Sequence, residues 1–288
     1  MPRSVAGASL LNGRMSSTSS KIAAFRRIVW NHYRTQGRHA LPWRESHDPY
    51  RVLVSEVMLQ QTQVERVIPY YAAWMKKYPM VRKLAKAPLG DVLRLWQGLG
   101  YNRRAKMLHE TAKSVVRDHS GIFPKTPEEL EKLPGIGPYT ARAVAAFAHN
   151  EDVIFIETNI RTVVTHHFFP GASKVDDKDI LAILEKAYPQ GKSREWYSAL
   201  MDYGSFLKRS GIRLNARAKG YTSQTKFAGS KREARGAILK ALVQGPRKGE
   251  FLADVLGPSR RAQMRSQLAS LTKEGLIELK RGQFRLPG

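Results

Sequence analysis

The chain has 288 residues, of which 42% are apolar, so it has enough material for a sizeable core and is not a disordered tail. It carries 49 Lys and Arg against 24 Asp and Glu, and this net charge of +25 favours a polyanionic partner over a merely soluble basic protein. Cysteine is absent, which excludes disulfides and thiolate metal sites, and no apolar run approaches the roughly 20 residues of a membrane helix. We therefore expect an intracellular protein with one large domain or two domains.

Residues 1–20 contain no acidic residue and end in a serine-rich run, so we expect a disordered leader there. Its arginines and serines faintly resemble an organellar transit peptide. A translation start assigned upstream of a true start at Met15 explains these residues at least as well. We therefore favour such a start over organellar targeting.

From residue 21 the apolar residues recur at helical spacing, beginning with Ile22, Phe25, Ile28 and Val29. We expect helices over residues 21–34, 50–60, 63–78, 89–96, 103–119, 127–132, 140–149, 160–168, 177–187 and 194–208. Residues 153–156 are a short candidate strand that stands alone. Residues 21–209 are therefore predicted to form an all-α core with short connections.

The composition changes after this core, and residues 210–230 are basic with few apolar side chains, as expected of a linker. Residues 231–288 predict helices over 231–243, 248–256 and 259–274, followed by short strands over 276–279 and 283–286. Three helices and a two-stranded wing are the winged-helix pattern. The third helix carries Arg260, Arg261 and Arg265, which favours DNA contact slightly over a small packing module with solvated arginines.

Residues 133–141, Leu-Pro-Gly-Ile-Gly-Pro-Tyr-Thr-Ala, place two glycines between two predicted helices. Gly135 and Gly137 let the backbone approach a ligand closely, and the helix beginning near Tyr139 adds unpaired N–H groups and a positive dipole end. The hairpin therefore suits a phosphate, and its spacing resembles the helix-hairpin-helix element that grips one DNA strand without reading its sequence. On its own, the motif is equally consistent with a plain turn.

Glu56 lies within the apolar run 51–60, and at helical spacing its neighbours on the same face are Val52, Leu53 and Leu59. Burial disfavours the charged form of a carboxylate, so we expect a raised pKa and a proton held near neutral pH for delivery. A glutamate that rotates to solvent or pairs with a buried arginine is an equal alternative.

Gln60, Gln61 and Thr62, with Gln63 after them, interrupt the core pattern and predict an exposed polar corner. Amide side chains there suit the gap that a base leaves when it flips out of a duplex. A polar turn without a role is the commoner meaning of such a cluster.

Glu157 ends an apolar segment and precedes a predicted helix, for which we expect Thr158 or Asn159 to be the N-cap. An acid at this place favours the helix dipole, which is a purely structural explanation. The functional alternative is a partner for Glu56 across a pocket. Cleavage of a glycosidic bond needs one group to protonate the leaving group and a second to stabilise the oxocarbenium-like sugar or orient water.

These motifs together resemble those of the MutY-type adenine DNA glycosylases, which belong to the helix-hairpin-helix base-excision superfamily. The matching segments stand in that family's order and spacing at residues 41–44, 48–50, 55–64, 67–70, 95–101, 133–141 and 201–204. The resemblance runs from about residue 21 to residue 208, and residues 55–64 (Ser-Glu-Val-Met-Leu-Gln-Gln-Thr-Gln-Val) are highly specific to this branch.

The resemblance implies a bilobal all-α fold with DNA in the cleft and the target base flipped into a pocket. It places Glu56 on the family's catalytic acid, Asn159 on an active-site Asn, and Gln61 in the segment that wedges into the duplex. Tyr101 matches a residue beside the flipped-out lesion pair. Tyr139 falls where some members have Tyr or Ser and strand-cleaving relatives have a Schiff-base Lys, which implies a glycosylase without strong lyase activity.

The chain departs from the family at Glu157, where the family has Asp. The extra methylene moves the carboxylate by about 1 Å, and a misplacement of that size can cost about a hundredfold in rate. The family also usually carries a four-cysteine iron–sulfur cluster after residues 201–204, which this chain cannot form without cysteine. We expect the basic residues 208–226 to supply phosphate contacts instead, with Lys208, Arg209 and Arg213 as candidates.

A third departure is the short tail in place of the family's larger Nudix-like C-terminal domain, which leaves the preference for 8-oxoguanine or guanine open. We expect a monofunctional, cluster-free enzyme that removes adenine opposite either base. Glu56 protonates the adenine, Glu157 stabilises the sugar cation and helps a water attack, and Tyr139 and Asn159 orient the site. Arg44 is expected to support it.

Two alternatives remain from the sequence: a thymine or uracil glycosylase at G mismatches, and a non-catalytic DNA-binding protein. The expected partner is double-stranded DNA with a mismatch or lesion, the expected state is a monomer, and the expected location is cytoplasmic, with the nucleoid. His166 and His167 lack a metal-ligand pattern and are expected to pack or face solvent. No cofactor is expected beyond a candidate monovalent cation on carbonyls near Gly135 and Gly137.

Overall fold

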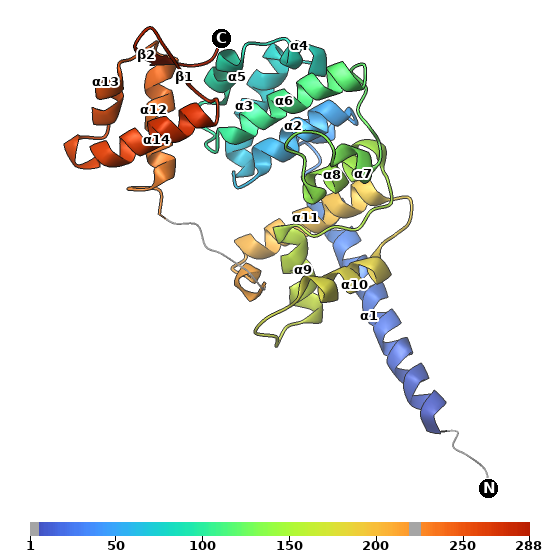
Figure 1. Cartoon of the computed structure of the whole chain (residues 1–288). Helices are drawn as coiled ribbons and strands as arrows, with labels where there is room; N and C mark the ends of the chain where they lie inside the picture. Colours follow the sequence, from blue (N-terminus) through green and yellow to red (C-terminus); the bar gives the residue numbers. More distant parts are fainter. Residues whose placement is uncertain (1–5, 219–225) are drawn as a thin grey trace. The chain divides into compact units, whose positions relative to one another are not determined.

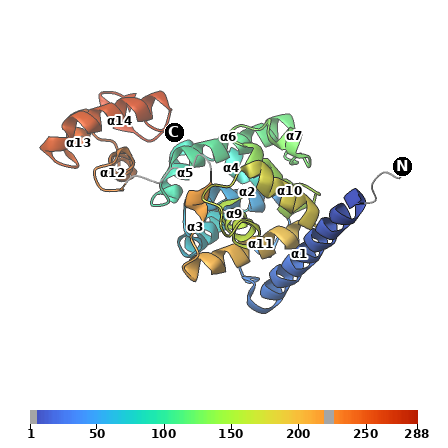
Figure 2. The same cartoon turned by 90° about the horizontal axis from the view of Figure 1, so that it is seen from below.

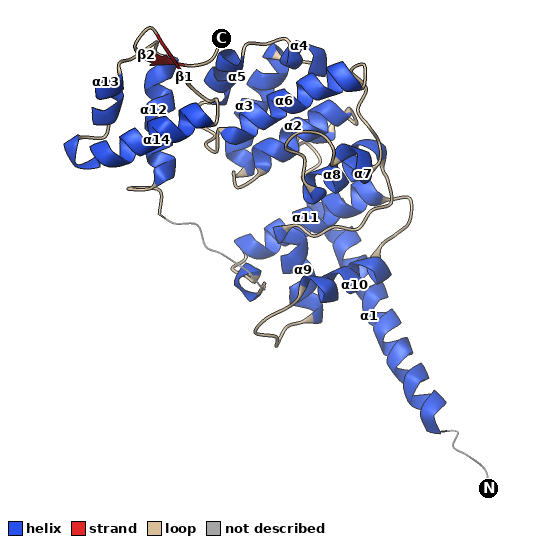
Figure 3. Cartoon of the chain, viewed as in Figure 1, coloured by secondary structure: helices blue, strands red, loops and turns tan. Residues whose placement is uncertain are grey.

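The computed structural model describes residues 6–218 and 226–288, and the chain is mostly helical, as the sequence predicts (Figures 1 and 3). In these two ranges the only strands are β1 (Glu278–Lys280) and β2 (Gln283–Arg285), which pair antiparallel. A search of the same residues finds no helix with the length and apolar character needed to cross a bilayer. The described chain divides into two compact units, which we call unit 1 (residues 6–40 and 145–218) and unit 2 (residues 41–144 and 226–288).

Unit 2 begins with a group of helices around two buried tryptophans. Its elements are η1 (Pro42–Arg44), α2 (Pro49–Leu59), α3 (Val64–Lys77), α4 (Val81–Ala85), α5 (Leu89–Trp96), α6 (Arg103–Asp118), α7 (Pro127–Leu130) and α8 (Pro138–Val144). Trp74 and Trp96 pack edge to face, with ring centroids 5.6 Å apart. The Trp74 indole N–H donates to the Tyr50 hydroxyl at 3.0 Å, and that hydroxyl donates to the Tyr78 carbonyl at 2.8 Å. This buried chain of hydrogen bonds fixes the start of α2 against α3.

Unit 1 is built on the long helix α1 (Ala6–Gln36), with α9 (Thr158–Phe168), α10 (Asp177–Ala187) and α11 (Ser193–Arg209). Helix α11 packs along both α1 and α9 (Figure 2). The Arg26 guanidinium on α1 donates to the carbonyls of Lys186, Ala187 and Tyr188 at 3.2, 2.8 and 2.9 Å. These carbonyls end α10, so a cation sits where the helix dipole favours one.

The last part of unit 2 comprises α12 (Lys231–Val243), α13 (Gly249–Asp254), η4 (Pro258–Arg260) and α14 (Arg261–Lys273), followed by the β1–β2 hairpin. The Ser230 side chain accepts from the Glu233 N–H at 3.3 Å, and the Glu233 carboxylate accepts from the Gly229 N–H at 2.7 Å, which caps α12. Arg260 pairs with Glu233, and Arg261 pairs with Asp254. These two arginines therefore stabilise the segment's own helices, which neither the DNA-contact expectation nor the alternative of solvated arginines included.

Several elements differ from the sequence-based expectation. Helix α1 begins at Ala6, so residues 6–20 continue the helix, whereas we expected a disordered leader; no proline interrupts them. Helix α4 was not predicted, because five residues with two exposed basic side chains carry almost no periodic signal. Residues 215–218 of the expected linker pack in unit 1, where the Val175 N–H donates to the Arg217 carbonyl at 2.9 Å. Residues 1–5 and 219–225 lie outside the described part.

The candidate strand at residues 153–156 forms no strand and pairs with none in the described chain. The Tyr197 hydroxyl donates to the Val153 carbonyl at 2.8 Å, and the Phe155 N–H donates to the same hydroxyl at 3.3 Å. A side chain thus satisfies backbone groups that a neighbouring strand would otherwise pair. The helix expected over residues 140–149 begins at Pro138 and ends in a π-helical turn, η2 (Ala145–His149).

His167 on α9 is a half-buried packing residue. Its ring lies 5.3 Å from that of Phe25, and its Nε2 is 3.0 Å from the Tyr203 hydroxyl oxygen. Burial lowers the pKa of His167 to about 4, with a smaller contribution from the neighbouring His166.

Because the folded state resists protonation of His167, the free energy of unfolding is expected to fall as the pH drops from about 6.5 to about 4. The slope from this residue is at most about 1.4 kcal/mol per pH unit. Urea unfolding of wild type and His167→Gln across this range tests it, and the variant should show the flatter profile. An unchanged slope in the variant would assign the titration to another group.

Candidate functional site

The first candidate group is Glu56, which lies in the middle of α2 in unit 2. Helix α2 starts where the sequence directs it, since the Asp48 carboxylate accepts from the Tyr50 N–H at 2.9 Å and Pro49 takes the first helical position. Apolar residues on the inner face then bury the helix, and the Glu56 residue is only 8% exposed. The alternative of a glutamate turned to solvent is therefore wrong.

Tyr139, on α8, is the partner of this buried carboxylate. Its hydroxyl donates to Glu56 Oε2 at 2.9 Å, across 83 positions of sequence. A buried carboxylate is costly unless hydrogen bonds satisfy it, and a phenol is a donor that adds no charge. The Tyr139 phenol therefore satisfies one oxygen of the buried carboxylate and ties α8 to α2.

Arg104 is a site-supporting residue that the sequence analysis missed. From the first turn of α6 its guanidinium donates to three carbonyls at the end of α2, those of Val57 (2.7 Å), Met58 (3.1 Å) and Gln60 (2.5 Å). It also donates to the Gly100 carbonyl at 3.2 Å. Burial lowers the pKa of Arg104 to about 10, so it stays cationic at neutral pH. The sequence did hold one indication of this role: Arg104 lies in the first turn of a predicted helix, where the helix dipole disfavours a cation.

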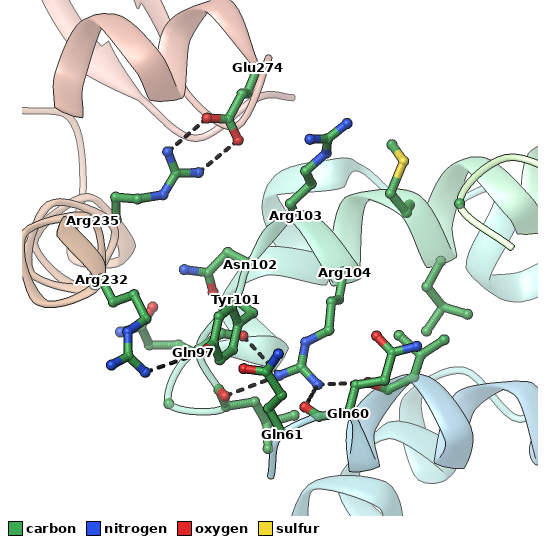
Figure 4. A pocket seen from close by; sticks show the side chains of 18 of the residues that line it. Gln60, Gln61, Gln97, Tyr101, Asn102, Arg103, Arg104, Arg232, Arg235 and Glu274 are labelled. Carbon is green, nitrogen blue, oxygen red and sulfur yellow. Dashed lines mark hydrogen bonds and ion pairs between the residues drawn. The ribbon is translucent and has the colours of Figure 1, made fainter. Parts of the chain in front are cut away.

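A pocket of about 1170 Å³ gathers most of the predicted DNA-contacting residues of unit 2 (Figure 4). Gln60, Gln61, Tyr101, Arg104 and Gly135 line it, together with residues of α12. Gln61 and Tyr101 have φ angles of 55° and 48°, a left-handed backbone that non-glycine residues seldom adopt. Ser120, Asn150 and Arg281 share this conformation, so at the pocket it shows two tight turns and does not by itself mark a functional site.

Helix α12 contributes two arginines to this pocket, which the sequence analysis did not single out. Arg232 donates to the Tyr101 hydroxyl at 3.1 Å, and its guanidinium lies 5.7 Å from the centre of the Tyr101 ring. Arg235 forms two hydrogen bonds of 2.7 Å with the Glu274 carboxylate (Figure 4). Only the structure connects Arg232 to Tyr101, because 131 positions of sequence separate them.

The hairpin between α7 and α8 has one glycine fixed by packing and one that faces open space. Gly135 has a φ of +77°, and a Cβ there would lie 2.5 Å from the Met107 Cβ. A Cβ on Gly137 would meet no atom within 4 Å. The Thr111 hydroxyl donates to the Pro134 carbonyl at 2.6 Å and ties the hairpin to α6. The backbone at Gly137 is therefore open to a ligand.

The second carboxylate, Glu157, lies in unit 1 and is itself the N-cap of α9, so our expectation of Thr158 or Asn159 as the cap is wrong. Its carboxylate accepts from the Asn159 N–H at 2.6 Å and from the Asn159 side-chain amide at 3.2 Å. The Thr158 hydroxyl donates to the same carboxylate. The longer side chain folds back onto the helix, where a shorter Asp would be the usual cap.

The remaining predicted residues lie as follows. In unit 1, the Lys208 ammonium donates to the Thr158 hydroxyl at 3.1 Å, whereas Arg209 and Arg213 are exposed. In unit 2, Arg44 ends η1, and the Thr62 hydroxyl donates to the Gln60 carbonyl at 3.2 Å. The structure thus joins Glu56 to Tyr139 within unit 2 and Glu157 to Asn159 within unit 1.

Comparison with known proteins identifies the family. Residues 54–190 match the family described as HhH-GPD superfamily base excision DNA repair protein. The chain is 36% identical over 272 residues to an adenine DNA glycosylase of Mycolicibacterium smegmatis, a match that covers 87% of this chain and 92% of that protein. The chain belongs to the adenine DNA glycosylase family of this superfamily. It is also 37% identical over 277 residues to an adenine DNA glycosylase of Mycobacterium tuberculosis, with 86% of this chain and 89% of that protein covered.

The fold comparison agrees with this membership in the HhH-GPD superfamily. The solved structure of a thermostable thymine-DNA glycosylase aligns with a TM-score of 0.58 and 27% identity, covering 66% of this chain and 88% of that one.

The iron–sulfur cluster that the MutY resemblance implies does not fit the residues of this chain. Such a cluster is held by cysteine thiolates, and the full sequence has no cysteine. The segment that follows residues 201–204 instead begins with Ser205, Phe206, Leu207 and Lys208 on the last turns of α11.

The capping role of Glu157 predicts how its substitutions affect stability. Glu157→Ala removes the acceptor for the Asn159 N–H and should lower the free energy of unfolding by about 1 kcal/mol. Glu157→Asp keeps a favoured cap and should leave stability within about 0.5 kcal/mol of wild type. Chemical unfolding of both variants measures this. Equal losses in the two variants would show that the carboxylate does not cap α9.

Proposed function

We propose that this chain is a glycosylase that excises adenine mispaired with 8-oxoguanine or guanine in double-stranded DNA. The observation that carries the proposal is the buried Glu56 carboxylate with the Tyr139 hydroxyl as its hydrogen-bond donor. A protein that only binds DNA has no need to bury a carboxylate on an apolar helix, because the burial costs free energy. Family membership and the net charge of +25 support DNA as the partner.

In this reaction the Glu56 acid protonates the flipped-out adenine and makes it a better leaving group. The bond between the sugar C1′ and the adenine nitrogen breaks, the electron pair leaves with the base, and the sugar becomes oxocarbenium-like. Glu157 stabilises that cation and orients the attacking water, while Tyr139 and Asn159 hold the two carboxylates. The phenol at Tyr139 cannot form a Schiff base, so the proposed enzyme leaves the DNA strand intact.

The backbone at Gly137 supplies a phosphate contact, and the pocket lined by Gln61 and Tyr101 receives the duplex where the base has left it. Base extrusion costs a few kcal/mol, which amide and aromatic side chains in the gap offset. The tail of three helices and a hairpin acts as a winged-helix-like module, with Arg232 placed beside Tyr101. The enzyme acts as a monomer.

A second candidate function is removal of thymine or uracil opposite guanine, which the structural likeness to a thymine-DNA glycosylase favours. The two activities differ in the base that enters the pocket, so a substrate panel separates them.

Single-turnover base release is measured on duplexes with A opposite 8-oxoguanine, A opposite G, T opposite G and U opposite G. We expect release of adenine from the first two. Glu56→Gln keeps an acceptor for the Tyr139 hydroxyl but cannot donate the acid proton, so base release should fall at least about a hundredfold while duplex binding persists. Release from only the T or U duplexes would overturn adenine specificity, and no release from any duplex would favour a DNA-binding protein without activity.

The hairpin gives a separate prediction about affinity. Gly137→Ala should fold normally, because its Cβ meets no neighbour, but should weaken duplex binding about tenfold by blocking a close phosphate contact. Gly171→Ala, at another open loop glycine outside this pocket, is the matched control. Fluorescence anisotropy with a labelled duplex measures both. If Gly137→Ala binds like the control, the hairpin does not contact phosphate.

A further inference from the structure

Lys208 is the most unusual of the cations predicted to contact phosphate. It is half-buried, and its ammonium donates to the Thr158 hydroxyl at 3.1 Å, one residue from Glu157. Its neighbour Arg209 is exposed and donates to Ser205 on the same helix at 3.3 Å. The two basic side chains at the end of α11 thus have different partners. Of the two, Lys208 contacts the start of α9.

A close helix contact brings Lys208 to this place. Gly204 lies one helical turn earlier on α11, against the backbone of Asn159, and a Cβ on it would come within 2.3 Å of the Asn159 carbonyl oxygen. Residues four apart share a helix face, so Lys208 faces α9 as Gly204 does. The absence of a side chain at Gly204 therefore allows the Lys208 stem to run along the start of α9.

The start of α9 is an electrostatically unfavourable place for a cation, and the Glu157 carboxylate acts in the opposite direction. The N-terminus of a helix carries partial positive charge, which repels an ammonium group. Burial lowers the pKa of Lys208, and the attraction of Glu157 acts against this effect. The nearby Arg161 is paired with Asp177, so it does not compete for the Glu157 carboxylate. The Glu157 carboxylate is therefore the group that offsets the cost of placing Lys208 here.

We infer that Lys208 is a positioning residue that fixes the Glu157 carboxylate through the Thr158 hydroxyl, rather than a phosphate contact. The hydroxyl accepts from the ammonium and donates to Oε1 of the carboxylate, while the Asn159 N–H and side-chain amide donate to Oε2 and Oε1. The long, flexible glutamate is thereby restricted to one orientation. This inference rests on the proposed function, in which Glu157 stabilises the sugar cation.

Lys208→Met tests the role, because it keeps the aliphatic stem and removes the charge. We expect single-turnover adenine release at saturating protein to fall about tenfold, with the dissociation constant and its salt dependence close to those of wild type. Lys208→Arg should recover part of the rate. Arg209→Met, which removes the same charge one residue away, should weaken binding and reduce the salt slope of log K by about 1. Binding is measured in the Glu56→Gln background, which cannot release the base.

A second measurement does not depend on activity. Thr158→Val removes the bridging hydroxyl, so the shifts in urea midpoint caused by Lys208→Met and Thr158→Val should be non-additive in the double variant. Additive shifts would overturn the inference, as would a Lys208→Met variant that loses salt-dependent affinity and keeps its rate at saturation. Absence of base release from wild type would instead refute the proposed function, while the unfolding measurement would still decide the role of Lys208.

Discussion

Burial of a carboxylate on an apolar helix is the constraint on which the rest of this structure depends. Burial removes water from the Glu56 carboxylate, and the fold must replace that water with hydrogen-bond donors. Tyr139 meets this requirement, but only if α8 packs tightly against α2. The glycine hairpin before α8, locked to α6 by Thr111 and by the contact between Gly135 and Met107, sets the position of that helix. Packing at the hairpin and chemistry at Glu56 are therefore linked.

The two carboxylates of the proposed reaction have different surroundings. Glu56 lies on the buried face of α2, where the Tyr139 hydroxyl donates to its carboxylate. Glu157 lies at a helix N-terminus beside an ammonium group, where an anion is stabilised. The two residues are the same amino acid, so only their local surroundings give them different proposed roles.

Most helices could be predicted from the sequence, because apolar periodicity and caps such as Asp48 are local signals. Glu56 was identifiable for the same reason, as an acid within an apolar run. Contacts between distant segments could not be predicted: nothing local shows that Arg104 reaches the end of α2, or that Arg232 meets Tyr101. The cap of α9 was misassigned because glutamate is seldom an N-cap, and only the structure shows its side chain accepting from the Asn159 N–H.

Arg104 connects two loops that the sequence treats as separate. One guanidinium group binds the turn that carries Gln61 and also the turn that carries Tyr101, through carbonyls on both. Neither turn can shift alone without stretching charge-assisted hydrogen bonds in a partly dry environment. Both turns depend on the same guanidinium group, so the effects of substitutions in them on the free energy of unfolding should be non-additive. An evolutionary change in one turn is therefore constrained by the other.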